Sequence, residues 1–279
     1  MRPGLPSVTV LTEPTAQAYD LVASAYDLLT TGYEYGPWLR AIDRLAHEHG
    51  LAGRRALDVA CGTGKSLEAL LDLGYDAVGC DSSPGMAAVA AAKLAGRAQV
   101  FVADMCGLPA LGGFDLMTCL DDALNHLPTP ELVTAALRAM GTNLAPGGLL
   151  AFDVNTFGAY RDPGDLIVED GERIVLWHGG PARLDAPGGR AEVALDVLSR
   201  GGDGLWRRAS ASWGHWHYPL ASIPGLVEAS GLEVVAVRGQ LEGGVLEADA
   251  DEERHRKAVF LARIRRPERR DHALAPVDD

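Results

Sequence analysis

Short apolar runs of strand length alternate along the chain with segments in which apolar residues recur every three to four positions. The first pattern predicts buried strands and the second predicts amphipathic helices. The predicted strands lie at residues 55–60, 77–80, 99–103, 114–120 and 149–154. The predicted helices that connect them lie at residues 65–73, 84–96 and 131–144. Since strands joined by helices form right-handed parallel crossovers, the pattern predicts a doubly wound, Rossmann-like α/β fold.

Two helices are expected before the first strand, at residues 15–30 and from Pro37 onward, with Trp38 in the core. After the fifth strand, residues 165–218 change to short alternating runs joined by glycine-rich turns, which predicts an antiparallel β insertion. The strands expected in the insertion lie at residues 167–168, 174–177, 191–197 and 209–217. A helix at residues 223–230 and strands at 232–237 and 258–264 then complete the sheet. We therefore expect one domain over residues 15–266, with flexible ends at 1–14 and 267–279.

Composition and charge narrow the choice of partners. The chain has 279 residues, of which 47% are hydrophobic and 23% charged, as in a globular protein with a sizeable core. A net charge of -13 without a stripe of Lys and Arg argues against binding to nucleic acid or to an anionic membrane. No apolar run reaches the roughly 18 residues of a membrane span. We therefore expect a cytoplasmic protein whose partner is a small molecule.

The four cysteines form no CxxC pair and no cluster with histidine at metal-ligand spacing, so we expect reduced thiols and no metal site. Cys61, Cys80 and Cys119 are interpreted as small core fillers near strand ends.

The first predicted strand ends in the segment DVACGTG at residues 58–64. Its glycines permit a tight turn and a close approach of a ligand to the backbone. A dinucleotide fingerprint needs a further glycine where Leu67 stands. A phosphate loop fits the Gly64-Lys65-Ser66 segment, but it needs a glycine where Val59 stands. A nucleotide-hydrolysing enzyme is therefore kept only as a distant alternative.

Carboxylates also follow the second and third predicted strands. Asp81 ends the second strand and Asp104 ends the third. Asp81 is placed to accept hydrogen bonds from both hydroxyls of a ribose, and Asp104 to accept one from an adenine amino group. Met86 and Met105 offer apolar contacts to the adenine ring. These residues predict a nucleoside site at the carboxyl edge of the sheet.

The chain resembles class I S-adenosylmethionine-dependent methyltransferases over about residues 16–264, because it carries their motifs in the same order. The motifs are residues 58–64, Asp81, Asp104-Met105 and Leu120-Asp121-Asp122. The resemblance implies a seven-stranded sheet with an antiparallel last strand, and S-adenosyl-L-methionine as the cofactor. It also implies that Gly62 and Gly64 border the methionine part of the cofactor, although many members have glycine where Ala60 stands. The cofactor-binding residues that we expect are Tyr26, Asp58, Ala60, Gly62, Gly64, Asp81, Ser82, Met86, Asp104, Met105 and Leu120.

Further motifs resemble bacterial small-molecule N-methyltransferases that act on aminosugars and lincosamide-type antibiotics. They are Tyr19-Asp20, Tyr26-Asp27, residues 120–126 and Phe152-Asp153-Val154-Asn155. This resemblance implies a small amine as the methyl acceptor and a role in antibiotic biosynthesis. It also implies that the insertion is a lid or an oligomer contact, and the tryptophans of the insertion are compatible with a homodimer.

Three residues are candidates for the chemistry of methyl transfer, which requires alignment and exclusion of water. An amine acceptor needs only its neutral form, whereas a hydroxyl needs a base, for which His126 is the candidate. Tyr19 and Tyr26 are two helical turns apart, so both can face the cleft. Capping or packing is the alternative for His126, and helix packing for the tyrosines. The resemblance alone favours an N-methyltransferase, with an O-methyltransferase that uses His126 and a non-catalytic binding module as alternatives.

His215 and His217 lie with Trp213 on one face of a predicted strand. A metal pair is conceivable, but the sequence offers no third ligand. We therefore expect the two histidines in a pocket wall or on the strand surface.

Overall fold

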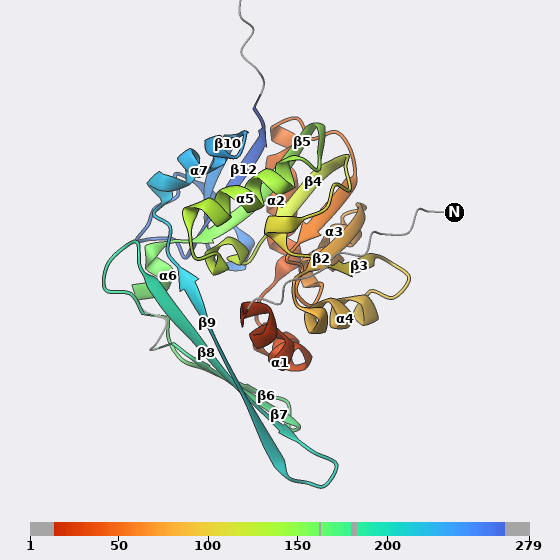
Figure 1. Cartoon of the computed structure of the whole chain (residues 1–279), viewed down its shortest axis with the longest axis vertical. Helices are drawn as coiled ribbons and strands as arrows, with labels where there is room; N and C mark the ends of the chain where they lie inside the picture. Colours follow the sequence, from red (N-terminus) through yellow and green to blue (C-terminus); the bar gives the residue numbers. More distant parts are fainter. Residues whose placement is uncertain (1–13, 162, 180–182, 266–279) are drawn as a thin grey trace, which may run out of the picture.

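An eight-stranded sheet forms the centre of the computed structural model, which describes residues 14–161, 163–179 and 183–265. Its strands are β1 (Arg55–Val59), β2 (Asp76–Asp81), β3 (Gln99–Val102), β4 (Phe114–Cys119), β5 (Leu144–Asn155), β10 (Leu232–Gln240), β11 (Leu246–Ala248) and β12 (Lys257–Ile264). They follow the order β11-β10-β12-β5-β4-β1-β2-β3 (Figure 1). Neighbouring strands from β1 to β5 are parallel, and β12 is antiparallel to both β5 and β10. The order reverses between β1 and β4, which is where ligands bind in sheets of this kind.

The expected Rossmann-like fold is therefore confirmed, including the antiparallel last strand. The eighth strand, β11, is an addition that the sequence did not predict. It pairs antiparallel with β10 at the edge of the sheet, from Gln240 and Leu246 to Arg238 and Ala248. Three residues are too few to show the alternation by which a strand is recognised.

Helices cover both faces of the sheet. They are α1 (Pro14–Leu29), α2 (Tyr35–Glu48), α3 (Lys65–Asp72), α4 (Pro84–Lys93), α5 (Pro130–Gly141), α6 (Phe157–Arg161) and α7 (Ile223–Ala229). The α2 and α3 helices pack on one face, where Trp38 is fully buried as expected. The α5 and α7 helices pack on the other face. Because side chains alternate along a strand, Leu116 of β4 packs in the core beneath α2 and α3, and Met117 packs in the core beneath α5 and α7.

The α5 helix ends at Gly141, three residues before the predicted end at position 144. The side-chain amide of Asn143 donates to the carbonyl of Pro109, and its oxygen accepts from the backbone of Leu111 and Gly112. These contacts tie residue 143 to the neighbouring loop, so the helix does not continue through it.

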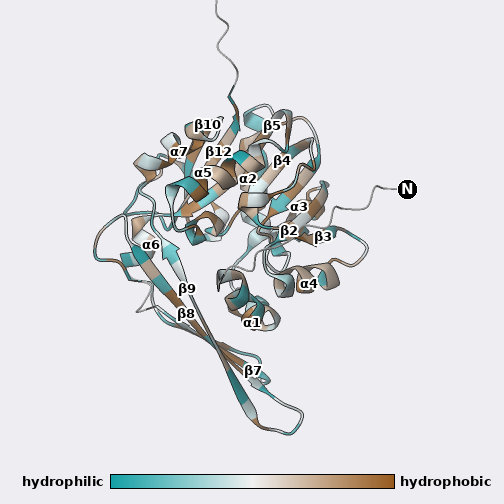
Figure 2. Ribbon diagram, in the orientation of Figure 1, coloured by the Kyte–Doolittle hydropathy of each residue, from teal (hydrophilic) through white to brown (hydrophobic). Residues whose placement is uncertain are grey.

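The predicted antiparallel insertion forms a second sheet in the order β6-β7-β8-β9. Its strands are β6 (Leu166–Glu169), β7 (Arg173–His178), β8 (Arg190–Arg200) and β9 (Trp206–Trp216). This sheet extends from the body as an arm, and α1 lies between the arm and the central sheet (Figure 1). Val22 and Ala25 of α1 share a buried cluster with Val193 and Trp213 of the arm. Hydrophobic and hydrophilic segments alternate along the arm, whereas the central strands are mostly hydrophobic (Figure 2).

The predicted flexible ends, residues 1–14 and 267–279, lie outside the described residues except for Pro14, which begins α1. Within the described ranges, no helix combines the length and the apolar character that crossing a membrane requires.

Candidate functional site

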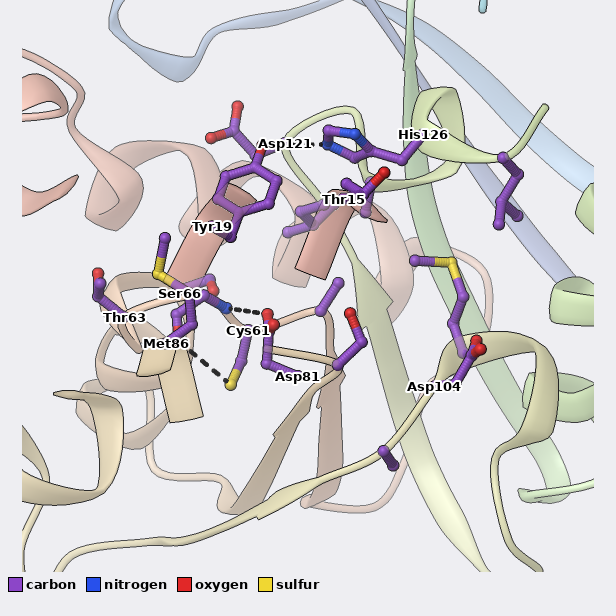
Figure 3. Close-up of a pocket in the computed structure, with 18 of the residues that line it drawn as sticks. Thr15, Tyr19, Cys61, Thr63, Ser66, Asp81, Met86, Asp104, Asp121 and His126 are labelled. Atoms are coloured by element: carbon purple, nitrogen blue, oxygen red, sulfur yellow. Dashed lines mark hydrogen bonds between the residues drawn. The ribbon is translucent and has the colours of Figure 1, made fainter. Parts of the chain in front are cut away.

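A pocket lies at the carboxyl edge of the parallel strands, with α1 along one side (Figure 3). Most of the site residues predicted from the sequence line this pocket. The nominated residues that line it are Tyr19, Tyr26, Ala60, Gly62, Asp81, Ser82, Met86, Asp104, Met105, Leu120 and His126. Among the lining residues that were not nominated are Thr15, Tyr35, Lys65 and Asp121. The strand ends converge because parallel strands present their carboxyl ends at one edge.

Asp58 and Gly64 are the exceptions, because they were expected beside the cofactor but do not line the pocket. The buried Asp58 carboxylate accepts hydrogen bonds from Ser66 Oγ at 2.5 Å and Thr118 Oγ1 at 2.6 Å. Burial raises the pKa of Asp58 to about 6. Gly64 precedes α3 with φ of +86°, where a Cβ would lie 3.1 Å from side-chain atoms of Ala90 and Leu94. Both residues thus stabilise the glycine loop at residues 60–64 without lining the pocket.

Asp81 holds the glycine loop in place. One carboxylate oxygen accepts from the Gly62 N–H at 2.8 Å (Figure 3), and the other accepts from the Ser83 N–H at 2.9 Å. Burial raises the pKa of Asp81 to about 6, against the opposing effect of these two backbone donors. Each oxygen can still accept a further hydrogen bond. At Gly62, which has φ of +53°, a Cβ would meet no protein atom within 4 Å, so the missing side chain leaves space beside the loop.

Asp104 ends the third strand region at the N-terminus of a short 3₁₀ helix, η1 (Met105–Gly107). One of its carboxylate oxygens accepts from the Cys106 N–H at 2.8 Å. This bond leaves the second oxygen of Asp104 for a ligand on the pocket side.

The aspartates of the two Tyr-Asp pairs anchor α1. Asp20 accepts from Ser83 Oγ at 2.5 Å and from the Gly85 N–H at 2.7 Å. Asp27 accepts from Thr63 Oγ1 at 2.5 Å and forms an ion pair with Lys93 at 2.5 Å. These contacts fix the helix so that the tyrosines of the same pairs face the pocket.

Lys65 contributes to the same anchoring. Its ammonium donates to the carbonyl and the hydroxyl of Thr30, both at 2.8 Å. The lysine that a phosphate loop would use for a nucleotide is therefore bound to the end of α1.

Tyr19, His126 and His215 meet on the side of the pocket opposite the glycine loop. Tyr19 Oη lies 3.1 Å from Nε2 of His126, which belongs to the 3₁₀ helix η2 (Ala123–His126) (Figure 3). The same Nε2 atom lies 3.3 Å from Nε2 of His215 on β9. Tyr26 packs edge-on against Tyr19, with ring centroids 5.8 Å apart. Burial lowers the pKa of His126 and of His215 to about 3, so both imidazoles are neutral.

Three carboxylates surround one buried ammonium next to this group. Lys257 Nζ lies 2.9 Å from Asp121, 2.7 Å from Asp122 and 3.3 Å from Asp153. Burial alone would lower the pKa of Lys257, but the three carboxylates raise it well above its usual value. Asp121 and Asp122 both have left-handed backbones, with φ of 60° and 56°. Lys257 was not among the predicted site residues, and the only signal for it in the sequence is its place directly before the apolar run at residues 258–264.

His215 and His217 are both buried, and they have different neighbours. His215 contacts the pocket residue His126, whereas His217 Nδ1 accepts from the Gly188 N–H at 2.8 Å and its Nε2 lies 3.2 Å from Glu252. Among the described residues, no group of three or more His, Cys, Asp or Glu side chains is arranged to hold a metal ion. The two histidines therefore act in separate contacts.

Cys61, Cys80 and Cys119 are buried free thiols, and burial raises the pKa of each. A buried thiol with a raised pKa is a poor nucleophile, in keeping with the expected role as a small filler.

Comparisons with known proteins agree with this geometry. A family profile described as a methyltransferase domain matches residues 56–148. A Geobacillus sp. protein described as a methyltransferase is 30% identical over 181 residues, which are 62% of this chain and 72% of that protein. A ubiquinone biosynthesis O-methyltransferase from Methylococcus capsulatus is 38% identical over 107 residues, or 37% of this chain and 44% of that enzyme. This chain thus covers less than half of the second relative.

Two solved structures share the fold over most of their length. An S-adenosylmethionine-dependent methyltransferase from Clostridium acetobutylicum has a TM-score of 0.72 and 20% identity, covering 88% of this chain and 98% of that one. A sugar N-methyltransferase from Streptoalloteichus sp. has a TM-score of 0.68 and 25% identity, covering 95% and 99%. The cofactor is S-adenosyl-L-methionine, and the chain belongs to the class I S-adenosylmethionine-dependent methyltransferases.

Proposed function

We propose that this chain transfers a methyl group to the neutral amine of a small molecule in natural-product biosynthesis. The bound cofactor supplies an electrophilic methyl group on a positively charged sulfur. The similarity to a sugar N-methyltransferase supports the amine. The chemistry at His126, described below, supports the amine independently.

The pocket residues fit the cofactor. Asp81 would accept hydrogen bonds from the two ribose hydroxyls, because its oxygens each retain acceptor capacity beyond the backbone bonds to Gly62 and Ser83. The space left at Gly62 would take the methionine part. Asp104 would accept from the adenine amino group, and Met86 and Met105 would contact the ring.

The low pKa of His126 and its contacts are the observation that favours nitrogen over oxygen as the methyl acceptor. A hydroxyl acceptor needs a base that takes its proton during the reaction. His126 is the base that the sequence offers, but burial lowers its pKa to about 3 and its Nε2 already faces Tyr19 and His215. Such an imidazole is a weak base at neutral pH. A neutral amine carries its own lone pair and requires only alignment and exclusion of water.

The second candidate function is O-methylation, which the similarity to a ubiquinone biosynthesis O-methyltransferase favours. In that case His126 would have to accept the hydroxyl proton. The two functions differ in the product and in the pH dependence of turnover.

The test uses labelled cofactor with aminosugars and with analogues in which a hydroxyl replaces the amine. We expect mass spectrometry to find the label on nitrogen. We expect kcat/KM to rise with pH as the amine loses its proton, without an inflection from His126 near neutral pH, because the pKa of His126 is about 3. His126→Ala should retain substantial turnover. Methylation of oxygen, together with a loss of roughly a hundredfold or more in His126→Ala, would establish the O-methyltransferase instead.

A further inference from the structure

We propose that His215 is a positioning residue that, together with Asp122, fixes the proton of His126 on Nε2. His126 then takes part in the site as a hydrogen-bond donor and not as a base. The functional meaning of this arrangement rests on the proposed N-methyl transfer, because it would select an amine over a hydroxyl. The arrangement itself can be tested without turnover.

The two histidines must share one proton between their facing atoms. Nε2 of His126 and Nε2 of His215 are 3.3 Å apart, and the ring centroids are 4.4 Å apart at 74°. Two N–H groups at this distance would repel each other, and so would two lone pairs. A hydrogen bond forms only when one nitrogen carries a proton and the other does not.

Asp122 decides which histidine carries that proton. Nδ1 of His215 lies 3.5 Å from one oxygen of Asp122, and Asn155 Nδ2 donates to the same oxygen at 2.9 Å. Burial raises the pKa of Asp122, and Lys257, 2.7 Å from the other oxygen, opposes that rise and favours the anionic form. An adjacent carboxylate favours a proton on the nearer imidazole nitrogen. His215 is therefore protonated on Nδ1, and its Nε2 presents a lone pair to His126.

His126 must then carry its proton on Nε2, and its other nitrogen agrees with this assignment. Nδ1 of His126 is buried and has no hydrogen-bond partner among the residues that the structure describes. An unpartnered buried acceptor is less unusual in proteins than an unpartnered buried N–H. Because a neutral imidazole carries a single proton, the lone pair belongs on Nδ1 and the proton on Nε2.

This assignment sets the direction of the hydrogen bond to Tyr19. The single proton on Nε2 of His126 is shared between Nε2 of His215 at 3.3 Å and Tyr19 Oη at 3.1 Å, so the hydroxyl hydrogen of Tyr19 is available to a ligand. Asp121 also lines the pocket, but it accepts from Tyr35 at 2.7 Å and pairs with Lys257. A hydroxyl nucleophile would thus meet a protonated Nε2 at His126 and an already paired carboxylate at Asp121, whereas a neutral amine needs no base. The titratable groups that face the two histidines are Tyr19, Asp121, Asp122, Tyr160 and Lys257, and Tyr26 packs behind Tyr19.

The test is long-range ¹⁵N–¹H NMR on the full chain with ¹⁵N-labelled histidine, which distinguishes protonated from unprotonated ring nitrogens. We expect the wild type to show His126 with a proton on Nε2 and His215 with a proton on Nδ1. In Asp122→Asn the side-chain amide can donate to Nδ1 of His215, so the protons on both histidines should exchange positions. His217 is the internal control, since the Gly188 N–H fixes its proton on Nε2 in every variant.

Turnover gives the second measurement. In His215→Gln and Asp122→Asn, kcat toward an amine should fall no further than it does in His126→Ala, because both residues act on the site through His126. The affinity for S-adenosylhomocysteine should change less than about twofold, because neither side chain lines the pocket. A wild-type His126 protonated on Nδ1, or tautomers unchanged in Asp122→Asn, would overturn the proposal. Methylation of oxygen with the expected tautomers would instead refute the proposed function alone.

Discussion

The pocket has two sides that are built in different ways. We call the side proposed to bind S-adenosylmethionine, with Gly62, Asp81 and Asp104, the cofactor side, and the side proposed to bind the methyl acceptor, with Tyr19 and His126, the acceptor side. On the cofactor side, Gly62, Asp81 and Asp104 stand at the ends of successive strands, and their supporting bonds reach a residue two positions away or the adjacent strand end. On the acceptor side, Tyr19 and His126 are 107 residues apart in the sequence, and His126 and His215 are 89 apart. The acceptor side therefore exists only when α1, η2 and β9 have packed together.

Because of this difference, we expect substitutions on the two sides to have different effects. The cofactor side uses a repeated strand-to-turn arrangement in which each carboxylate is positioned locally. The acceptor side depends on the arm, whose cluster with α1 includes Val22 and Trp213. We expect substitutions on the first side to change cofactor affinity, and those on the second to change stability or turnover.

The largest effect is expected from Lys257→Met on the acceptor side. The variant leaves the buried Asp153 and the partly buried Asp121 and Asp122 without their shared cation. Removal of one partner from a buried ionic group costs about 3–5 kcal/mol, which should appear as a lower free energy of unfolding in urea. Arg263→Met on the same strand is the control, because its pair with Glu233 is about 40% exposed and should contribute less than about 1 kcal/mol. Equal losses in both variants would show that Lys257 does not act as a buried counter-ion.

The next effect is expected from Asp81→Ala on the cofactor side. A hydrogen bond to a charged group contributes about 1.5–3 kcal/mol, so the loss of two should weaken binding of S-adenosylhomocysteine by about a hundredfold or more. Calorimetry measures this directly. Asp72→Ala on α3 is the control, since this aspartate is 66% exposed and pairs with Arg97 away from the pocket. Unchanged binding in Asp81→Ala would contradict the placement of the ribose.

The smallest effect is expected from Tyr19→Phe, which removes one neutral hydroxyl. Such a hydrogen bond contributes about 0.5–1.5 kcal/mol, so kcat should fall up to about tenfold. Affinity for S-adenosylhomocysteine should stay within about twofold. Tyr75→Phe removes a hydroxyl that donates to Asp43 outside the pocket, and it should leave kcat unchanged. If Tyr19→Phe weakened cofactor binding as much as turnover, the two sides would not be separable in this way.

The sequence predicted the cofactor side better than the acceptor side. Asp81 and Asp104 could be placed because they end apolar runs, and the carboxyl ends of parallel strands converge. Asp58 was expected beside the cofactor but does not line the pocket, and only its bonds to Ser66 and Thr118 reveal this, because a strand-end acid can point either into a pocket or away from it. His215 was assigned to the correct face of its strand, but its contact with His126 could not be foreseen.

The sequence by itself determined the alternation of strands and helices, the antiparallel arm and the chemical types at the strand ends, because periodicity and turn residues are local properties. Only the tertiary structure decided that Tyr19, His126 and His215 meet, that Lys257 neutralises three aspartates, and that both imidazoles are neutral. The physical reason is that contact and desolvation depend on the packing of distant segments, which no short stretch of sequence encodes.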